Sequence, residues 1–406
     1  MNKYKMKLKI FFNVILMFFA TGLLFAGNDI QNGRKDEGYV FRDEIVLPFT
    51  PVKDQYRSGT CWSFSALSLL ESEMMRLGKP EVDLSAMFIV RHVYPEKAEK
   101  YVRLHGNLGF SSGGAFHDVI NVIKKYGIVL ESVYSGLTNG ESKHIHGNMD
   151  NALREYVDAV AKKDKLPPAW QEAVEQTLDA HLGKIPQTFE FRGKRYTPKS
   201  FAADYVGLNM DDYVEITSYT HHPFYSKFIL EVPDNWSWGE VYNVPLNEMT
   251  EIIDYALKNG FTIAWAADIS EEGFAAGSKG VAVLTSAPAY NMTYSDIVRW
   301  EALPEKDKES KLYELNAVVP ELTVTQEMRQ QAFDNFETTD DHGMHIIGIA
   351  KDQAGNEYYK VKNSWGVNNK YNGLLYASKP YVAYKTMSIM LNKNAIPKNI
   401  REKLNL

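Results

Sequence analysis

Cysteine is nearly absent from this sequence: Cys61 is the only one among 406 residues. A single cysteine excludes an intrachain disulfide. A thiol that is kept as the only cysteine of the chain suits a chemical role, because the thiolate is a strong nucleophile and metal ligand. The alternative is a buried structural cysteine, which behaves as a small apolar residue.

An excess of basic charge is also absent. The chain has 45 lysines and arginines against 51 acidic residues, a formal net charge of −6 and no basic cluster. Since nucleic-acid-binding proteins present a basic patch or stripe, we expect no nucleic-acid partner. The histidine pairs His144/His146 and His221/His222 have no cysteine or acidic companion at metal-ligand spacing. We therefore expect solvated loop histidines, no metal and no cofactor.

Only one long apolar run is present, and it lies at the N-terminus. Four lysines between positions 3 and 9 precede the apolar residues 10–26, and Ala26-Gly27 supplies small residues for cleavage. We expect residues 1–26 to be a cleavable signal of an exported, periplasmic or secreted protein, with no stable membrane association afterwards. No cysteine lies near the cleavage site, which excludes a lipoprotein. An uncleaved anchor is the alternative, although the run is marginal for spanning a bilayer.

The remaining composition is that of a globular protein, with 45% apolar and 24% charged residues. The most informative stretch is residues 55–66, where a loop ending in Gly59 meets a predicted helix at Cys61. Apolar residues recur at spacings of three and four from Phe64 to Leu77, and Gly78 ends the pattern. Cys61 therefore falls in the first helical turn, where free N–H groups and the helix dipole favour a thiolate.

A thiolate needs a base and a group that orients this base, and two motifs far downstream offer both. They are Asp341-His342-Gly343-Met344 and Lys362-Asn363-Ser364-Trp365-Gly366. Residues 345–350 and 358–362 have the pattern of a β-hairpin, which would place His342 and Asn363 at one end. Alternation along an extended chain puts His345 on the opposite face from His342, so we expect His345 to be a packed or exposed bystander.

In this order, the blocks Gln-x5-Cys-Trp-x-Phe-Ser, Asp-His-Gly-Met and Lys-Asn-Ser-Trp-Gly resemble papain-fold cysteine peptidases. The resemblance implies an α+β protein with the papain-like two-subdomain fold, a helical half plus a β-barrel-like half, with helical insertions. It also implies Cys61 as nucleophile, His342 as base and Asn363 as the residue that orients the base. Gln55 and the backbone N–H of Cys61 would hold the oxyanion. Cys61 and His342 would rest as a thiolate–imidazolium pair.

The same resemblance assigns three residues to substrate binding. Gly113 and Gly114 would offer bare backbone against which an extended peptide pairs as a strand. They also fit an ordinary loop that enters a predicted helix ending at Gly127. Trp365 would cover the hydrogen bond between His342 and Asn363, a role that is compatible with a plain core tryptophan.

Within that family, the chain is more similar to the branch of bleomycin hydrolase and bacterial aminopeptidase C. Cys61 and His342 lie much farther apart than the roughly 130–150 positions of the family signature. The branch implies a homo-oligomeric aminopeptidase for short peptides, restricted by a C-terminal tail in its cleft. This sequence ends soon after its last predicted strand, so we expect no such tail and keep a thiol endopeptidase as an alternative. A catalytically dead secreted peptide-binding module is the alternative from another class.

The predicted organisation has four parts. These are the signal peptide (1–26), the helical half with Gln55 and Cys61 (27–137), a mainly helical insertion (138–225), and the β-rich half with His342 and Asn363 (226–406), which includes a second insertion at about 275–330. Residues 150–180 have the composition of two helices broken at Pro167-Pro168. A helix at 246–257 precedes a buried strand at 261–266, and residues 48–53 are expected to be an extended strand.

Overall fold

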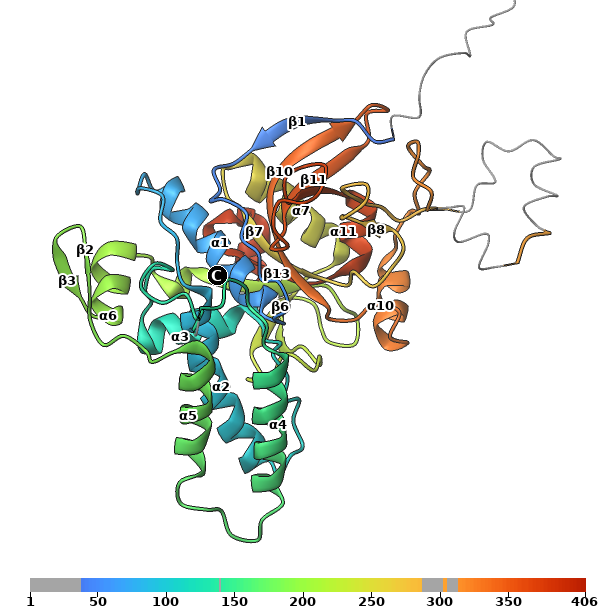
Figure 1. Cartoon of the computed structure of the whole chain (residues 1–406). Helices are drawn as coiled ribbons and strands as arrows, with labels where there is room; N and C mark the ends of the chain where they lie inside the picture. The colour runs from blue at the N-terminus through green and yellow to red at the C-terminus, as the bar shows by residue number, and fades with distance from the viewer. Residues whose placement is uncertain (1–37, 139, 287–301, 305–312) are drawn as a thin grey trace, which may run out of the picture. The chain divides into compact units, whose positions relative to one another are not determined.

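The computed structural model describes residues 38–138, 140–286, 302–304 and 313–406, which are drawn as a coloured ribbon in Figure 1. From Gly38 onward, the described residues form one compact unit. The predicted signal peptide at residues 1–26 and part of the predicted insertion at about 275–330 lie outside the described residues. No helix in the described part of the chain combines the length and apolar character that crossing a bilayer requires.

The first part of the described chain is helical, as the apolar spacing predicts. Helix α1 (Cys61–Arg76) begins at the cysteine itself. Helix α2 (Ala86–Arg103) is capped by Ser85, whose Oγ accepts a hydrogen bond from the backbone N–H of Phe88 at 2.9 Å. Helix α3 (Phe116–Tyr126) ends at Gly127, whose φ of +88° is a conformation that favours glycine.

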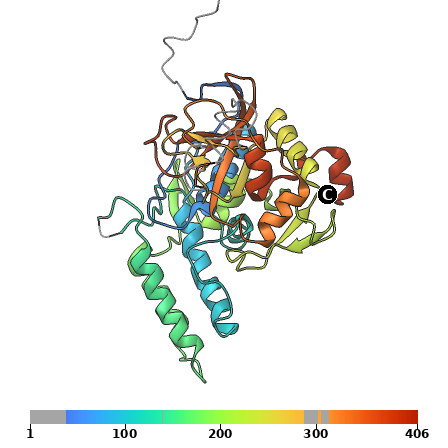
Figure 2. The same ribbon diagram turned by 90° about the vertical axis from the view of Figure 1, so that its right-hand side faces the viewer.

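Residues 138–225 contain two long helices, α4 (Gly147–Ala161) and α5 (Trp170–Leu182). The helices flank Pro167-Pro168, as predicted, because proline removes a helical N–H donor and clashes with the preceding turn. Both helices contact α2, and the three extend together away from the sheet (Figures 1 and 2). The segment continues with β2 (Phe189–Phe191), β3 (Lys194–Tyr196), α6 (Pro198–Ser200), η1 (Phe201–Val206), η2 (Met210–Asp212) and β4 (Tyr213–Thr217). The predicted domain boundaries stay predictions; β4 lies inside this range and pairs with a strand of the main sheet.

The second part is built on an eleven-stranded sheet with the order β5-β6-β4-β13-β7-β10-β11-β12-β9-β8, while β1 pairs with β10 beside this path. Its other strands are β1 (Phe41–Val46), β5 (Lys227–Ile229), β6 (Glu240–Asn243), β7 (Ile263–Ala267), β8 (Phe274–Ala275), β9 (Val281–Ala282), β10 (His342–Asp352), β11 (Glu357–Lys362), β12 (Leu374–Ser378) and β13 (Thr386–Asn392). The helical elements beside it are α7 (Leu246–Lys258), α10 (Gln326–Asp334), α11 (Lys379–Lys385), η3 (Lys393–Ala395) and α12 (Lys398–Lys403). This mixed architecture confirms the α+β fold class.

Most of the predicted strands are present in the structure, and one is not. Strands β10 and β11 form the predicted antiparallel hairpin, and β7 follows α7 as expected. The strand predicted at residues 48–53 is wrong, because the strand of this region is β1 at Phe41–Val46. Strand β1 exists through antiparallel pairing with β10, for example Asp43 with Ala350, a distant contact that no local pattern announces.

Two hydrophobic cores stabilise the two parts. The first lies among α1 to α5, with buried residues such as Leu70, Phe88 and Leu178. The second lies between the sheet and the helices α7, α11 and α12, with Ile253 and Ile346 among its residues. Helix α1 contacts β10 and β7, so the start of α1 meets the start of β10 where the two parts join.

Gly343 permits this close approach. A Cβ atom at this position would lie 2.8 Å from Oγ of Ser65, 3.2 Å from the ring of Phe116 and 3.3 Å from the backbone carbon of Cys61. Such separations are shorter than ordinary van der Waals contacts, so any side chain would push β10 away from α1. The glycine after His342 therefore brings this histidine to the N-terminus of the cysteine's helix.

Candidate active site

Cys61 occupies the first turn of α1. The carbonyl of Thr60 accepts hydrogen bonds from the N–H groups of Ser63 and Phe64 at 3.0 and 3.3 Å, so helical bonding starts at Thr60. The N–H groups of a first turn have no partner within the helix and point toward the thiol side of the helix end. The thiol of Cys61 and free backbone N–H donors therefore lie together at the start of α1.

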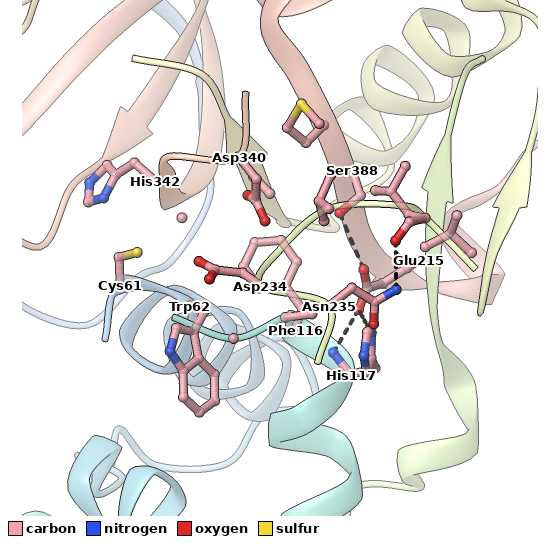
Figure 3. A pocket seen from close by; sticks show the side chains of 18 of the residues that line it. Cys61, Trp62, Phe116, His117, Glu215, Asp234, Asn235, Asp340, His342 and Ser388 are labelled. Atoms are coloured by element: carbon pink, nitrogen blue, oxygen red, sulfur yellow. Dashed lines mark hydrogen bonds and ion pairs between the residues drawn. The ribbon is translucent and has the colours of Figure 1, made fainter. Parts of the chain in front are cut away.

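His342 begins β10 and is held by Asn363, which directly follows β11. Nε2 of His342 lies 2.8 Å from Oδ1 of Asn363, and this oxygen also accepts a hydrogen bond from the N–H of Ser364 at 2.7 Å. Because an amide oxygen only accepts, Nε2 of the neutral ring carries the proton and Nδ1 has a free lone pair. Cys61 and His342 line one cavity and lie next to each other at its end, as Figure 3 shows.

Gln55 is fixed on both sides of its amide. Nε2 donates to the carbonyl of Ser58 at 2.7 Å, and Oε1 accepts from Oγ of Ser364 at 2.5 Å. Its backbone N–H also donates to the carbonyl of Ser364 at 2.8 Å. The amide is buried, and one N–H of its NH₂ group is left for another acceptor. The contact with Ser364 couples Gln55 to the loop that carries Asn363.

Trp365 and the two glycines take different positions. The ring of Trp365 lies over that of His342, with centroids 4.7 Å apart and an interplanar angle of 30°, although 41% of Trp365 is exposed. Gly114 lines the cavity, where a Cβ would lie 2.8 Å from the ring of Trp62. Gly113 differs, because a Cβ there would overlap the carboxylate of Asp234. The carboxylate of Asp234 therefore lies against the half-buried Gly113, and the predicted pairing of Gly113 with an extended peptide stays a prediction.

Burial controls the ionisation of the central pair. Burial raises the pKa of the Cys61 thiol to about 12, the carboxylates of Asp340 and Asp234 add to the rise, and the N–H groups of Gly343 and Trp62 oppose it. Burial lowers the pKa of His342 to about 4, against the effect of the hydrogen bond that its Nε2–H donates to Asn363. Both shifts favour the uncharged forms of the two groups. The resting thiolate–imidazolium pair expected from the sequence is therefore not favoured.

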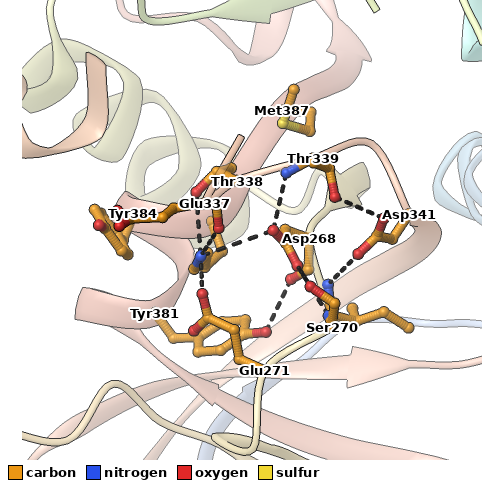
Figure 4. A network of polar contacts seen from close by, with 12 residues as sticks. Asp268, Ser270, Glu271, Glu337, Thr338, Thr339, Asp341, Tyr381, Tyr384 and Met387 are labelled. Atoms are coloured by element: carbon orange, nitrogen blue, oxygen red, sulfur yellow. Dashed lines mark hydrogen bonds and ion pairs between the residues drawn. The ribbon is translucent and has the colours of Figure 1, made fainter. Parts of the chain in front are cut away.

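A polar network positions the segment that leads into His342 (Figure 4). Asp268 follows β7 and accepts hydrogen bonds from the N–H groups of Ser270 at 2.8 Å and Thr339 at 2.9 Å. Asp341 accepts from the N–H of Ile269 at 3.3 Å, and Lys385 lies 3.7 Å from Asp268. These bonds tie residues 339–341 to the end of β7 directly before the histidine.

His345 lies in a second polar cluster behind this site. Its Nδ1 is 2.8 Å from Oγ of Ser68, which also accepts from Nζ of Lys362 at 2.8 Å. Nζ of Lys362 further donates to Thr50, whose hydroxyl lies 2.5 Å from Glu71. His345 is fully buried, in agreement with a packed bystander, and it does not line the cavity of Cys61.

The histidine pairs depart from the sequence expectation. His144 and His146 are buried, at 7% and 4% exposure, and are not solvated loop residues. His221 and His222 lie 3.1 and 2.8 Å from the two carboxylate oxygens of Glu231, an acidic companion from a nearby turn. Nδ1 of His221 accepts a hydrogen bond from Nε2 of Gln330, so its Nε2 carries a proton and is unavailable to a metal. The arrangement is a hydrogen-bonded cluster around Glu231 in which Nε2 of His221 is a donor and not a free metal ligand.

Several residues that line the cavity were not predicted from the sequence. Asp234, Asp340, Glu215 and His117 line it together with Cys61. Nδ1 of His117 is 2.8 Å from Glu215, and the ion pair outweighs burial and raises the pKa of His117 to about 9. The only local signal for these residues was Asp340 directly before Asp341-His342; the others reach the cavity from distant elements.

The chain matches a known protein family over most of its length. A model described as the Peptidase C1-like family matches residues 21–284 and 308–406. The chain belongs to the Peptidase C1-like family. This peptidase is thus a papain-type cysteine peptidase, as the sequence predicted from its three motifs.

Two curated relatives and one solved structure resemble this peptidase over most of its length. Aminopeptidase G of Lactobacillus delbrueckii subsp. lactis is 24% identical, over 88% of this chain and 84% of its own. Bleomycin hydrolase of Gallus gallus is 21% identical, over 90% of this chain and 85% of its own. The crystal structure of PepW from Lactobacillus rhamnosis HN001 has a TM-score of 0.65 at 20% identity, covering 90% of this chain and 84% of that one. The last comparison supports the papain-like fold.

Proposed function

We propose that this peptidase is an aminopeptidase that removes N-terminal residues from short peptides through a thioester on Cys61. One observation carries the chemistry: His342, held by Asn363 at 2.8 Å, lines the same cavity as a cysteine in the first turn of a helix. The aminopeptidase activity is supported by relatives named aminopeptidase G and aminopeptidase C that match most of the chain. It is also supported by the carboxylate of Asp234, which lies against Gly113 and leaves little room for residues before the cleaved bond.

The catalytic cycle begins from neutral groups. Cys61 attacks the peptide carbonyl while its proton passes to Nδ1 of His342, which the Asn363 hydrogen bond leaves free. The tetrahedral oxyanion accepts hydrogen bonds from the backbone N–H of Cys61 and the remaining N–H of Gln55. His342 then protonates the leaving amine, and water hydrolyses the thioester by the reverse proton path. Trp365 covers the ring of His342 and limits competing water at this hydrogen bond.

One assay separates the aminopeptidase from the two alternatives. Release of aminomethylcoumarin is measured from alanyl-aminomethylcoumarin and from its acetyl-capped form, with Cys61→Ser as the inactive control. We expect a clear preference for the free amine and no turnover by the control. Equal or better cleavage of capped and longer peptides would instead identify an endopeptidase. Absence of turnover, together with failure of an epoxide thiol reagent to label Cys61, would identify a binding protein without catalysis.

We also propose that the peptidase is exported, that residues 1–26 are removed as a signal, and that the mature chain has no stable membrane association. The support is the order of four lysines, an apolar run and Ala26-Gly27 in the sequence. N-terminal sequencing of the protein recovered outside the cytoplasm should begin near residue 27, and an intact Met1 would contradict the proposal. Homo-oligomerisation is a further proposal from the resemblance alone, and sedimentation of the mature protein tests it.

A further inference from the structure

The cavity of Cys61 is closed on one side by the segment between β5 and β6, residues 231–239. This segment is firmly fixed. The side-chain amide of Asn235 donates to the carbonyls of Leu230 and Gly239 at 2.9 Å, and Nε1 of the buried Trp236 donates to Asp118 at 2.8 Å. These contacts anchor the segment to α3 and to the end of β5. It is therefore a rigid wall of the cavity.

Asp234 projects from this wall over the loop that carries Gly113. Oδ1 of Asp234 accepts a hydrogen bond from Oγ of Ser111 at 3.2 Å, and its carboxylate occupies the place where a Cβ of Gly113 would lie. An extended peptide pairs with a backbone edge only when that edge is open. Because Asp234 lies against Gly113, a peptide in this cavity can extend only a short way beyond the cleaved bond toward its N-terminus.

Asp340 enters the same cavity from the opposite wall. Figure 3 shows the carboxylates of Asp340 and Asp234 pointing into the space between Cys61 and the ion pair of His117 with Glu215. Among the residues that the structure describes, Asp340 has no hydrogen-bond or ion-pair partner. Burial, together with the nearby charges of Asp234, Asp341 and Glu215, raises the pKa of Asp340 to about 8. The carboxylate thus lacks a compensating cation.

The cations nearby are already engaged. His117 is bonded to Glu215 through Nδ1 and to Ser237 through Nε2, at 2.8 Å each. Nζ of Lys97 donates to the backbone carbonyls of Ser111 and Gly113, and its charge reaches Asp234 only from a distance. Asp341 is satisfied by Thr339 and Ile269. Both Asp234 and Asp340 line the cavity, and within the described part of the chain neither forms an ion pair with a lysine, arginine or histidine.

We propose that Asp234 and Asp340 bind the free α-ammonium group of the peptide substrate and so determine that cleavage occurs after its N-terminal residue. The inference rests on the proposed aminopeptidase function and names the residues that would give it its specificity. Leu406 lines a surface groove with Lys124 and Lys393, and it is not among the residues lining the cavity. The two aspartates line the cavity beside Cys61, where the amine of a bound substrate would lie.

The two carboxylates also act on the nucleophile. Where they are ionised, Asp234 and Asp340 add, after burial, to the raised pKa of the Cys61 thiol. With a pKa of about 8, Asp340 is largely protonated near neutral pH, and a bound α-ammonium favours its ionised form. An α-ammonium bound between them neutralises this charge and makes the thiolate less costly as the sulfur attacks. A capped substrate brings no such charge. The free amine therefore contributes to both binding and reactivity.

The test measures kcat/KM of Asp234→Asn and Asp340→Asn for three substrates, which are alanyl-, acetylalanyl- and acetyl-lysyl-alanyl-aminomethylcoumarin. Loss of a charged hydrogen bond should lower the preference for the free amine by about 10- to 100-fold, mainly through KM. Asp340→Glu should recover part of the preference. Glu240→Gln removes an exposed carboxylate near the same segment and should leave the preference unchanged. Alkylation of Cys61 by iodoacetamide should be as fast as in the wild type or faster.

The outcomes separate this inference from the proposed function. A wild type that prefers capped substrates contradicts the aminopeptidase itself. A wild type that prefers the free amine, with the preference unchanged in both variants, overturns the role of the aspartates while the aminopeptidase stands. Loss confined to the acetyl-lysyl substrate assigns the site to a lysine side chain and overturns the α-amine proposal. If one variant does not fold, the other decides by the same comparison.

Discussion

The thiol of Cys61 is subject to two opposing effects. Its position in the first turn of α1 favours the thiolate, and such dipole effects contribute up to about 2 kcal/mol. Burial and the two aspartates raise its pKa from 9.0 to about 12, which corresponds to about 4 kcal/mol against the thiolate. Burial therefore outweighs the helix dipole, and the neutral thiol is the favoured form. The sequence predicted the helix position of Cys61 correctly but could not predict the carboxylates that face it, since they come from residues 234 and 340.

Asn363 should matter through the tautomer of His342. In Asn363→Ala the Nε2–H loses its acceptor, so the proton can move to Nδ1 and block the transfer from Cys61. We expect kcat/KM to fall by about 10- to 100-fold, mostly in kcat, with slower alkylation of Cys61 by iodoacetamide. Asn151→Ala, at an exposed position of α4, serves as a control for an asparagine outside the site. Unchanged kcat in Asn363→Ala would contradict the role of this hydrogen bond.

Gln55 should behave differently from Asn363, because it acts on the substrate and not on the thiol. Gln55→Ala removes one donor to the oxyanion, and we expect a loss of about 10²–10³ in kcat. Alkylation of Cys61 by iodoacetamide should stay close to the wild-type rate, since that reaction forms no oxyanion. A parallel loss of both rates would show that Gln55 supports the loop around Ser58 and Ser364 instead.

At the scale of elements, the active site depends on how closely β10 approaches α1. Gly343→Ala places a Cβ 2.8 Å from Ser65 and 3.3 Å from the backbone of Cys61. We expect unfolding free energy to fall by about 1–3 kcal/mol and activity to fall with it, because β10 must move and carries His342 along. Gly147→Ala, where no atom lies within 4 Å, is the matched control. Denaturant titration and kcat for both variants check this; wild-type values for Gly343→Ala would contradict it.

Some of these elements could be predicted from the sequence, and others could not. Helices α1, α3 and α7 and the β10–β11 hairpin follow from local apolar spacing and turn residues, and the motifs on them fix Cys61, His342 and Asn363. Strand β1 depends on pairing with β10, 307 residues away from Asp43 to Ala350, and β4 on pairing with β13, 173 residues away from Ile216 to Ile389. The segment 231–239 has little regular structure and reaches the cavity only through tertiary contacts. Its role in the site therefore could not be predicted from a local sequence pattern.

At the scale of the whole molecule, the ion pair of His117 with Glu215 joins the helical part to the sheet, because α3 carries the histidine and β4 the carboxylate. Nε2 of His117 also contacts Ser237 in the segment 231–239. Burial alone would lower the pKa of His117, but Glu215 outweighs it and the pKa rises from 6.5 to about 9. The folded protein therefore binds this proton more tightly than the unfolded chain does.

The contribution of the His117–Glu215 ion pair to stability should decrease as the pH rises. The stabilisation is complete below about pH 6.5, where both states are protonated, and it is lost as the pH rises through 9. We expect urea unfolding to show that the stability difference between wild type and His117→Gln shrinks by about 3 kcal/mol between pH 6 and pH 9.5. His181→Gln, at an exposed position of α5, should show no such change. A difference independent of pH would contradict the charged state of His117.

Peptide cleavage should pass through a covalent bond to Cys61, formed with the assistance of His342. Acid-quenched intact-mass spectrometry during turnover of alanyl-aminomethylcoumarin tests it most directly. We predict a species heavier by one alanyl group, located on Cys61, in the wild type and none in Cys61→Ser, with His342→Ala unable to form it at a comparable rate. Continued turnover by Cys61→Ser, or an alanyl group on another residue, would contradict the account.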